Sequence, residues 1–169
     1  TGNTRTNDSV IRRELSLLEG DPFNKTKLKT SLSALRRLGF FQSVNYRLDE
    51  YGSSNSIDII LDVKETNTGS VSFGVGYSSL NNTTFSFGLN EKNFLGEGKK
   101  VKLEANISDK KSTYNVGITE PYFMERHLSI YGDVFSQESE NNVGDVKSSS
   151  SGFGFGLGFK SQSLVQNYQ

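Results

Sequence analysis

Few residues of this chain have the types and spacing that catalysis or metal binding requires. His127 is the only histidine, and cysteine is absent, which excludes thiolate nucleophiles and thiolate metal sites. A lone histidine at the start of an apolar segment is a weak candidate for a general base or a ligand. The segment "GFGFGLGF" lacks the Lys-Ser/Thr pair of a phosphate-binding loop, and Gly96 and Gly98 of "NFLGEGKK" more simply shape a turn between strands. We therefore expect no enzymatic activity, no metal and no cofactor.

Composition excludes further classes of function. Lysine plus arginine and aspartate plus glutamate number 19 each, so the net charge is zero, and no basic run is interleaved with aromatic residues. A nucleic-acid partner is therefore not expected. The acidic residues are scattered, with no pair that can be placed in facing positions for acid–base work. The sequence has no run of about 18 apolar residues, so it predicts no transmembrane helix. A membrane strand is not excluded, because it needs only about ten alternating residues.

The periodicity of the chain changes near Gly69. Four of the 17 glycines precede this residue, and the others begin with it. Before it, apolar residues at helical spacing predict two amphipathic helices. These residues are Ile11, Leu15 and Leu18 in the first helix, and Leu28, Leu32, Leu35 and Leu38 in the second.

Capping signals set the expected helix boundaries. Residues 6–8 offer three candidate N-caps for the first helix, and Asp21 followed by Pro22 is expected to start the second. Gly39 is expected to end the second helix in the left-handed conformation. Two strands with period-two alternation follow, around Val44–Leu48 and Ile57–Val63.

The small sheet of these two strands is expected to have an open edge. Residues 1–3 read as the tail of an earlier strand that would complete it. An open edge can recruit an extended segment of another chain through backbone hydrogen bonds, or it can simply be solvated. Both alternatives stay open at this point.

Beyond Gly69 the alternation predicts six antiparallel strands in an up-and-down meander. Short connections at Leu80–Asn82 and Asp109–Lys111 suit hairpins. In "SSGFGFGLGFK", glycine fills every second position from residue 152 to residue 158, so one strand face carries Phe and Leu and the other is expected to be bare. The six apolar segments are Val71–Tyr77, Phe85–Leu89, Val101–Ile107, Tyr114–Ile118, Leu128–Ser136 and Gly152–Phe159.

Two environments would explain an apolar face on this meander: a second sheet in a soluble sandwich, or lipid around an outer-membrane barrel. The barrel is favoured by the small and polar opposite face, and by aromatic residues gathered at alternate connections, namely Phe94 and then Tyr122 with Phe123. Six strands cannot close such a barrel, for which about eight is the minimum. We therefore expect an α+β domain at 1–66, two helices on a small sheet, followed at 67–169 by an incomplete N-terminal portion of a transmembrane β-barrel.

Several segments carry a family resemblance. "GNTRTNDSVIRREL", "EGDPFN" and "ALRRLGFFQSV" resemble a polypeptide-transport-associated (POTRA) domain, in particular the one that adjoins a barrel. "VKETNTGSVSFGVGYSS", "NEKNFLGEGKKV" and "TEPYF" are similar to the opening barrel strands of the BamA family of outer-membrane protein assembly factors. The resemblance spans nearly all of residues 1–160, and the last nine residues are left unassigned.

The resemblance implies an insertase without ATP or cofactor, located in the bacterial outer membrane with its POTRA domain in the periplasm. In that family the first barrel strand opens as a lateral gate and pairs with a strand of the client protein. The matching strand here is Ser70–Ser79, in which Gly74 and Gly76 would weaken packing and ease strand exchange, unless they simply fit a crowded wall. The implied gate residues are Ser72, Phe73, Gly74, Val75, Gly76 and Tyr77.

The resemblance also implies partners: outer-membrane lipid, unfolded outer-membrane protein clients and accessory assembly lipoproteins. Arg12, Arg13 and Glu19 match the family's lipoprotein-docking region, with Phe40 and Phe41 either joining that surface or lying in the core. Two alternatives remain: a translocation pore of the same superfamily, and a soluble periplasmic binding module.

Overall fold

The computed structural model of the chain describes residues 1–50, 57–126, 128–141 and 146–159. Its residues group into two compact units. The first contains Thr1–Ser70 together with Glu91–Lys99, and the second contains Val71–Asn90 together with Lys100–Gln169. His127 and the last nine residues lie outside the described ranges, so the expectations for them stay untested.

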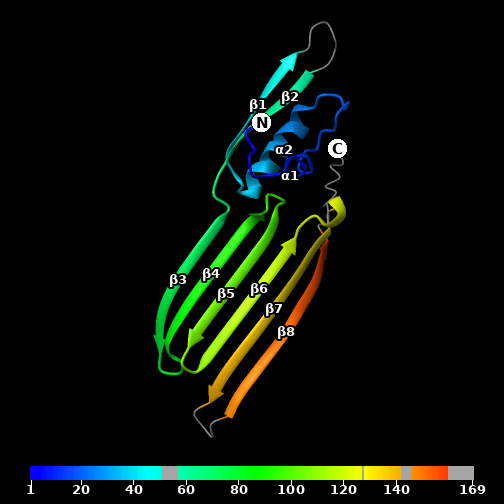
Figure 1. The fold of residues 1–169 in the computed structure, drawn as a ribbon. Helices are drawn as coiled ribbons and strands as arrows, with labels where there is room; N and C mark the ends of the chain where they lie inside the picture. Colours follow the sequence, from blue (N-terminus) through cyan, green and yellow to red (C-terminus); the bar gives the residue numbers. More distant parts are fainter. Residues whose placement is uncertain (51–56, 127, 142–145, 160–169) are drawn as a thin grey trace, which may run out of the picture. The chain divides into compact units, whose positions relative to one another are not determined.

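The first unit contains two helices and two strands (Figure 1). They are α1 (Asp8–Arg12), α2 (Lys25–Leu38), β1 (Phe41–Glu50) and β2 (Ile57–Glu65). The strands β1 and β2 pair in antiparallel fashion, with Val44 opposite Val63. Apolar residues of both helices and both strands form the core: Val10, Ile11, Leu28, Leu32, Leu35, Phe40, Phe41, Val44 and Val63.

The helix boundaries correct two expectations. The first helix ends at Arg12, before the predicted Leu18, which is 73% exposed. The second helix does not start at Asp21 and Pro22, because Asn24 is the N-cap and accepts hydrogen bonds from the backbone N–H groups of residues 26 and 27. Gly39 ends α2 at φ 71°, as its left-handed preference predicts.

The edges of the β1–β2 pair already have some partners. The carbonyl oxygen of Thr1 accepts a hydrogen bond from Val63 N at 2.9 Å, so the first residues run beside β2. On β1, Arg36 donates from Nη2 to the carbonyl oxygen of Val44 at 3.0 Å. Backbone groups that already have partners are less available to an incoming strand. The edges of this strand pair are therefore less open than the sequence predicted.

Six antiparallel strands follow in sequence order from one edge of a single sheet to the other, which confirms the meander (Figure 1). They are β3 (Gly69–Ser78), β4 (Asn82–Phe94), β5 (Lys99–Ser108), β6 (Lys111–Glu120), β7 (Leu128–Asn141) and β8 (Val146–Phe159), with a short 3₁₀ turn η1 (Phe123–Glu125) before β7. Among the described helices, none has the length and apolar character to cross a membrane.

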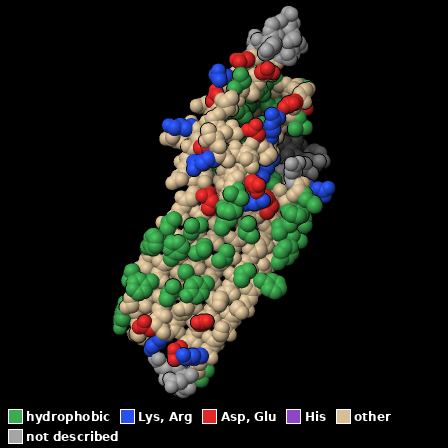
Figure 2. All heavy atoms as spheres, in the orientation of Figure 1, with side chains coloured by type: hydrophobic (Ala, Val, Ile, Leu, Met, Phe, Trp, Pro, Cys, Tyr) green, Lys and Arg blue, Asp and Glu red, His purple; other side chains and the backbone are tan. Residues whose placement is uncertain are grey.

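One face of this sheet is apolar and exposed. Phe73 is 81% exposed, Tyr77 79% and Phe153 83%. Figure 2 shows hydrophobic side chains spread over the sheet. In the soluble sandwich considered above, a second sheet would cover these residues. The described strands of this part of the chain form one sheet only. The structure therefore agrees with the open sheet of a partial barrel.

The opposite face of β8 is not bare, which corrects a further expectation. Its glycines lie opposite Phe135, Asp133, Tyr131 and Ser129 of β7. Side chains of the neighbouring strand occupy the space that the glycines leave.

Candidate functional site

Strand β3, which contains the candidate gate residues, lies at one edge of the six-stranded sheet. All ten of its residues are exposed. Alternation places Phe73, Val75 and Tyr77 on one face. Phe73 packs there against Phe87 of β4, with ring centroids 5.2 Å apart. Ser72 and the two glycines face the other way.

Crowding does not require glycine at positions 74 and 76 of β3. A Cβ added at Gly74 would meet only the Cβ of Ser86, at the ordinary contact distance of 3.6 Å, and one added at Gly76 would meet nothing within 4 Å. A crowded wall therefore does not explain glycine at these two positions within the described residues. Their effect is to leave these two positions of β3 without packing side chains on this face.

The docking candidates from the resemblance separate into two environments. Arg12 donates from Nη1 to Oε1 of Glu19 at 2.8 Å, and both side chains are exposed, at 69% and 89%. By contrast, Arg13 is turned toward the β4–β5 connection, where its Nη1 donates to the carbonyl oxygen of Glu97. Of the three charged docking candidates, Arg12 and Glu19 therefore form an exposed pair, and Arg13 does not belong to it.

Phe40 and Phe41 belong to the core of the first unit. Their exposed fractions are 3% and 8%, and their rings lie edge to face with centroids 6.3 Å apart. Of the two alternatives left by the sequence, these values support the core. We therefore leave both residues out of the docking surface proposed below.

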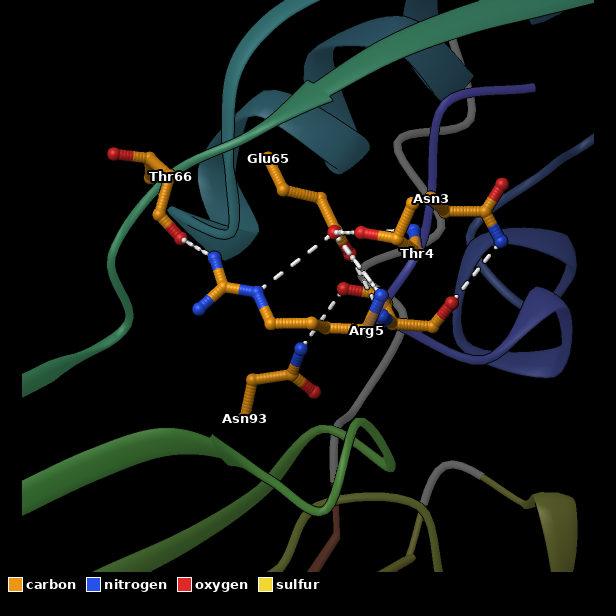
Figure 3. Close-up of polar contacts among 7 residues, drawn as sticks. Asn3, Thr4, Arg5, Glu65, Thr66 and Asn93 are labelled. Atoms are coloured by element: carbon orange, nitrogen blue, oxygen red, sulfur yellow. Dashed lines mark hydrogen bonds and ion pairs between the residues drawn. The ribbon is translucent and has the colours of Figure 1, made fainter.

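A polar cluster around Glu65, at the end of β2, holds the first residues of the chain (Figure 3). The Glu65 carboxylate accepts hydrogen bonds from the backbone N–H groups of Thr4 (3.1 Å), Arg5 (3.0 Å) and Thr6 (2.7 Å). The hydroxyl of Thr4 donates to it as well, and the Arg5 guanidinium donates from Nη2 to the carbonyl oxygen of Thr66. Only 8% of the Glu65 side chain is exposed.

This cluster continues into the β4–β5 connection, which groups with the first unit. Asn93 donates from Nδ2 to the hydroxyl of Thr6 at 2.9 Å, and its Oδ1 accepts from the backbone N–H of Gly98 at 2.7 Å. Asn93 and Thr6 are both buried. Asn7 N also donates to the carbonyl oxygen of Gly96 at 2.9 Å. The connection is thus held by satisfied, buried hydrogen bonds, which are costly to break singly.

The surroundings of Glu65 keep it ionised. Burial by itself would raise the pKa of this carboxyl group, but the hydrogen bonds from Thr6, Thr4 and Arg5 outweigh that effect and lower the pKa to about 2. The group is therefore a fixed acceptor at neutral pH. Nothing in the motifs marked this role, because most of its donors are backbone N–H groups that every residue carries.

The described residues offer little for covalent chemistry. They contain no group of three or more side chains able to hold a metal ion. A cavity of about 310 Å³ adjoins the polar cluster, but its lining residues Arg5, Thr6, Glu65 and Asn93 already bind one another or nearby backbone. What the chain presents instead is backbone at the β3 edge and apolar surface on the sheet.

Comparisons with protein families define the class. Residues 1–66 match the POTRA family, described as a surface antigen variable number repeat, and residues 93–169 match the Omp85 superfamily domain. The chain belongs to the Omp85 superfamily, with a POTRA domain followed by barrel strands. Its place is the bacterial outer membrane, with the POTRA domain on the periplasmic side.

Several of the similar proteins are outer membrane protein assembly factors named BamA. The Buchnera aphidicola protein is 30% identical over 173 aligned residues, which cover 99% of this chain and 27% of that protein. The Nitratidesulfovibrio vulgaris protein is 32% identical over 151 residues, covering 86% of this chain and 19% of that protein. The crystal structure of Haemophilus ducreyi BamA lacking POTRA domains 1–3 matches with a TM-score of 0.80 and 32% identity, over 92% of this chain and 30% of that one. The chain thus has the BamA type of organisation and spans about a quarter of the length of these relatives.

Replacing Glu65 by Gln should release the first residues of the chain. The amide lacks the charge that strengthens the hydrogen bonds from residues 4–6, so their backbone amides should exchange with solvent at least about tenfold faster in hydrogen–deuterium exchange. The matched control is Glu19→Gln, which changes an exposed glutamate. Unchanged exchange in the Glu65→Gln variant would contradict the assigned role.

The same carboxylate gives an expected pH dependence. Because its pKa is lower in the folded chain (about 2) than the ordinary value of 4.5, the stability it contributes is complete above about pH 4.5 and is lost as the pH falls toward 2. An NMR titration of the Glu65 side-chain carboxyl carbon should therefore show a midpoint near 2. A midpoint near 4.5 would be inconsistent with the hydrogen-bonded cluster.

Proposed function

We propose that this chain forms part of an outer-membrane protein assembly factor in which β3 offers its edge to a strand of an incoming barrel protein. The names of the similar proteins support the assembly role, and the strand order supports the choice of β3, which begins the sheet. The process needs no covalent step, so we propose a non-enzymatic protein without ATP or cofactor.

The observation that carries this proposal is the combination of edge position and unfilled glycines on β3. A strand at a sheet edge presents a row of backbone N–H and C=O groups to any extended segment. Gly74 and Gly76 remove two side chains that would otherwise pack against the next strand, and their added Cβ atoms would meet no crowding. Pairing at this edge therefore depends mainly on backbone hydrogen bonds, which a client strand can supply equally well.

The apolar face defines the second partner. With Phe73, Val75 and Tyr77 between 73% and 81% exposed, the proposal places lipid chains against this side of β3. A client strand added at the same edge would continue the alternation and place its own apolar residues in the lipid. The edge therefore templates both the backbone pairing and the orientation of the client's side chains.

We further propose that the exposed pair Arg12 and Glu19 contacts an accessory assembly lipoprotein. The pair is too exposed to stabilise the domain by much, because surface ion pairs contribute about 0–1 kcal/mol. Exclusion of water by a bound partner would strengthen the electrostatic interactions of both side chains with charged groups of that partner. Arg13 is left out of this contact because it is turned toward the β4–β5 connection.

Disulfide trapping in the full-length protein tests the gate. Ser72→Cys on β3 should form an adduct with a stalled client that has a cysteine in its terminal strand. The matched control is Asn106→Cys on β5, a polar position on the same face, since Asn106 Oδ1 accepts from the hydroxyl of Ser86, the residue near Gly74. Equal adduct yields from the two cysteines would remove β3 from the proposal.

A charge swap tests the docking pair. Arg12→Glu and Glu19→Arg should each weaken binding of purified accessory lipoproteins to the full-length protein by about tenfold. The double variant restores the internal pair with reversed polarity, so it should remain defective if the charges contact a partner. Recovery of binding in the double variant would show that the pair acts only within the domain. Lys29→Glu, an exposed change on α2, is the control.

A further inference from the structure

The glycines of β8 lie under side chains of the neighbouring strand. In the antiparallel register, Gly156 is opposite Tyr131 and Gly152 is opposite Phe135. Directly opposed residues project their side chains on the same face of a sheet. Each glycine therefore lies beside an aromatic ring of β7 on the face opposite to the exposed phenylalanines.

The rings occupy the space that a larger residue would need. A Cβ added at Gly152 would come within 2.8 Å of Cζ and 2.9 Å of Cε1 of Phe135. One added at Gly156 would overlap Cε1 and Cζ of Tyr131. Asp133, between the two rings, meets Gly154 in the same way. Glycine here leaves the space that these side chains of β7 occupy.

Gly74 and Gly76 of β3 differ in this respect. No side chain lies over Gly76, and Gly74 has only the Cβ of Ser86 at 3.6 Å. The same residue type thus serves opposite purposes on two strands of one sheet. On β8, glycine makes room for side chains of β7. At positions 74 and 76 of β3, glycine leaves the strand without such packing.

We propose that Tyr131 and Phe135 are positioning residues that hold β8 against β7 by packing their rings on the glycine backbone. An aromatic ring over a strand glycine covers a backbone that would otherwise be poorly packed. The β7–β8 hairpin is then a fixed part of the sheet, and these two strands stay paired when strands separate elsewhere. The rings resist separation more than sliding, because Gly154 and Gly158 would accept the same rings after a two-residue shift toward them.

A double-mutant cycle in the full-length protein, folded in lipid nanodiscs, tests this inference. Tyr131→Ala removes the ring, and Gly156→Ala forces the ring out of the space it occupies, so each should raise amide hydrogen exchange in β8 by about two- to tenfold. The double variant should be no worse than the more affected single variant, because both changes abolish one interaction. Tyr131→Phe keeps the ring and should exchange like the unmodified protein.

Gly76→Ala is the matched control, because its added Cβ meets no atom, and it should leave exchange in β8 unchanged. Should Gly156→Ala fail to fold, the cycle of Phe135→Ala with Gly152→Ala provides the same test. Additive effects in the cycle, or an effect of Tyr131→Phe as large as that of Tyr131→Ala, would overturn the inference. None of these measurements involves a client, so their failure would leave the proposed assembly function untouched.

Discussion

An uncovered apolar face on the six-stranded sheet is the constraint on which the rest of this structure depends. Burying a side chain the size of Phe or Leu is worth about 1.5–3 kcal/mol, and Phe73, Phe153 and Phe155 are 66–83% exposed. Water is a poor solvent for such a surface, whereas hydrocarbon chains match it without a second protein layer. The polar residues and glycines of the opposite face then have no packed core to fill, which is why small residues are acceptable there.

Two pairs of glycines within that sheet differ in their surroundings. Gly152 and Gly156 of β8 lie under the rings of Phe135 and Tyr131, so they contribute to cohesion between strands. Gly74 and Gly76 of β3 have space around them, and β3 lies at an edge. The loose packing at these two positions favours opening of the sheet at β3, and this difference connects the local chemistry of glycine to the proposed exchange of strands.

Much of this architecture follows from alternation and capping, because those patterns depend on neighbours along the chain. The six strands, their order and the end of α2 at Gly39 are of this kind. The acceptor role of Glu65 was not predictable, since its donors are mostly backbone N–H groups of a distant segment. The rings over the β8 glycines depend on the cross-strand register, which the length of the hairpin loop did not fix. The helical spacing through Leu18 did not predict the end of α1, because the chain leaves the helix after Arg12.

The central claim, that lipid covers the apolar face, is tested most directly by fluorescence quenching in nanodiscs. Single cysteines at Phe155, on the apolar face, and at Asn115, opposite Phe135 on the other face, would be labelled with bimane in the full-length protein. The account predicts that brominated lipid quenches the label at position 155 and aqueous iodide quenches the one at position 115. Quenching of both labels by iodide, with neither reached by brominated lipid, would contradict it.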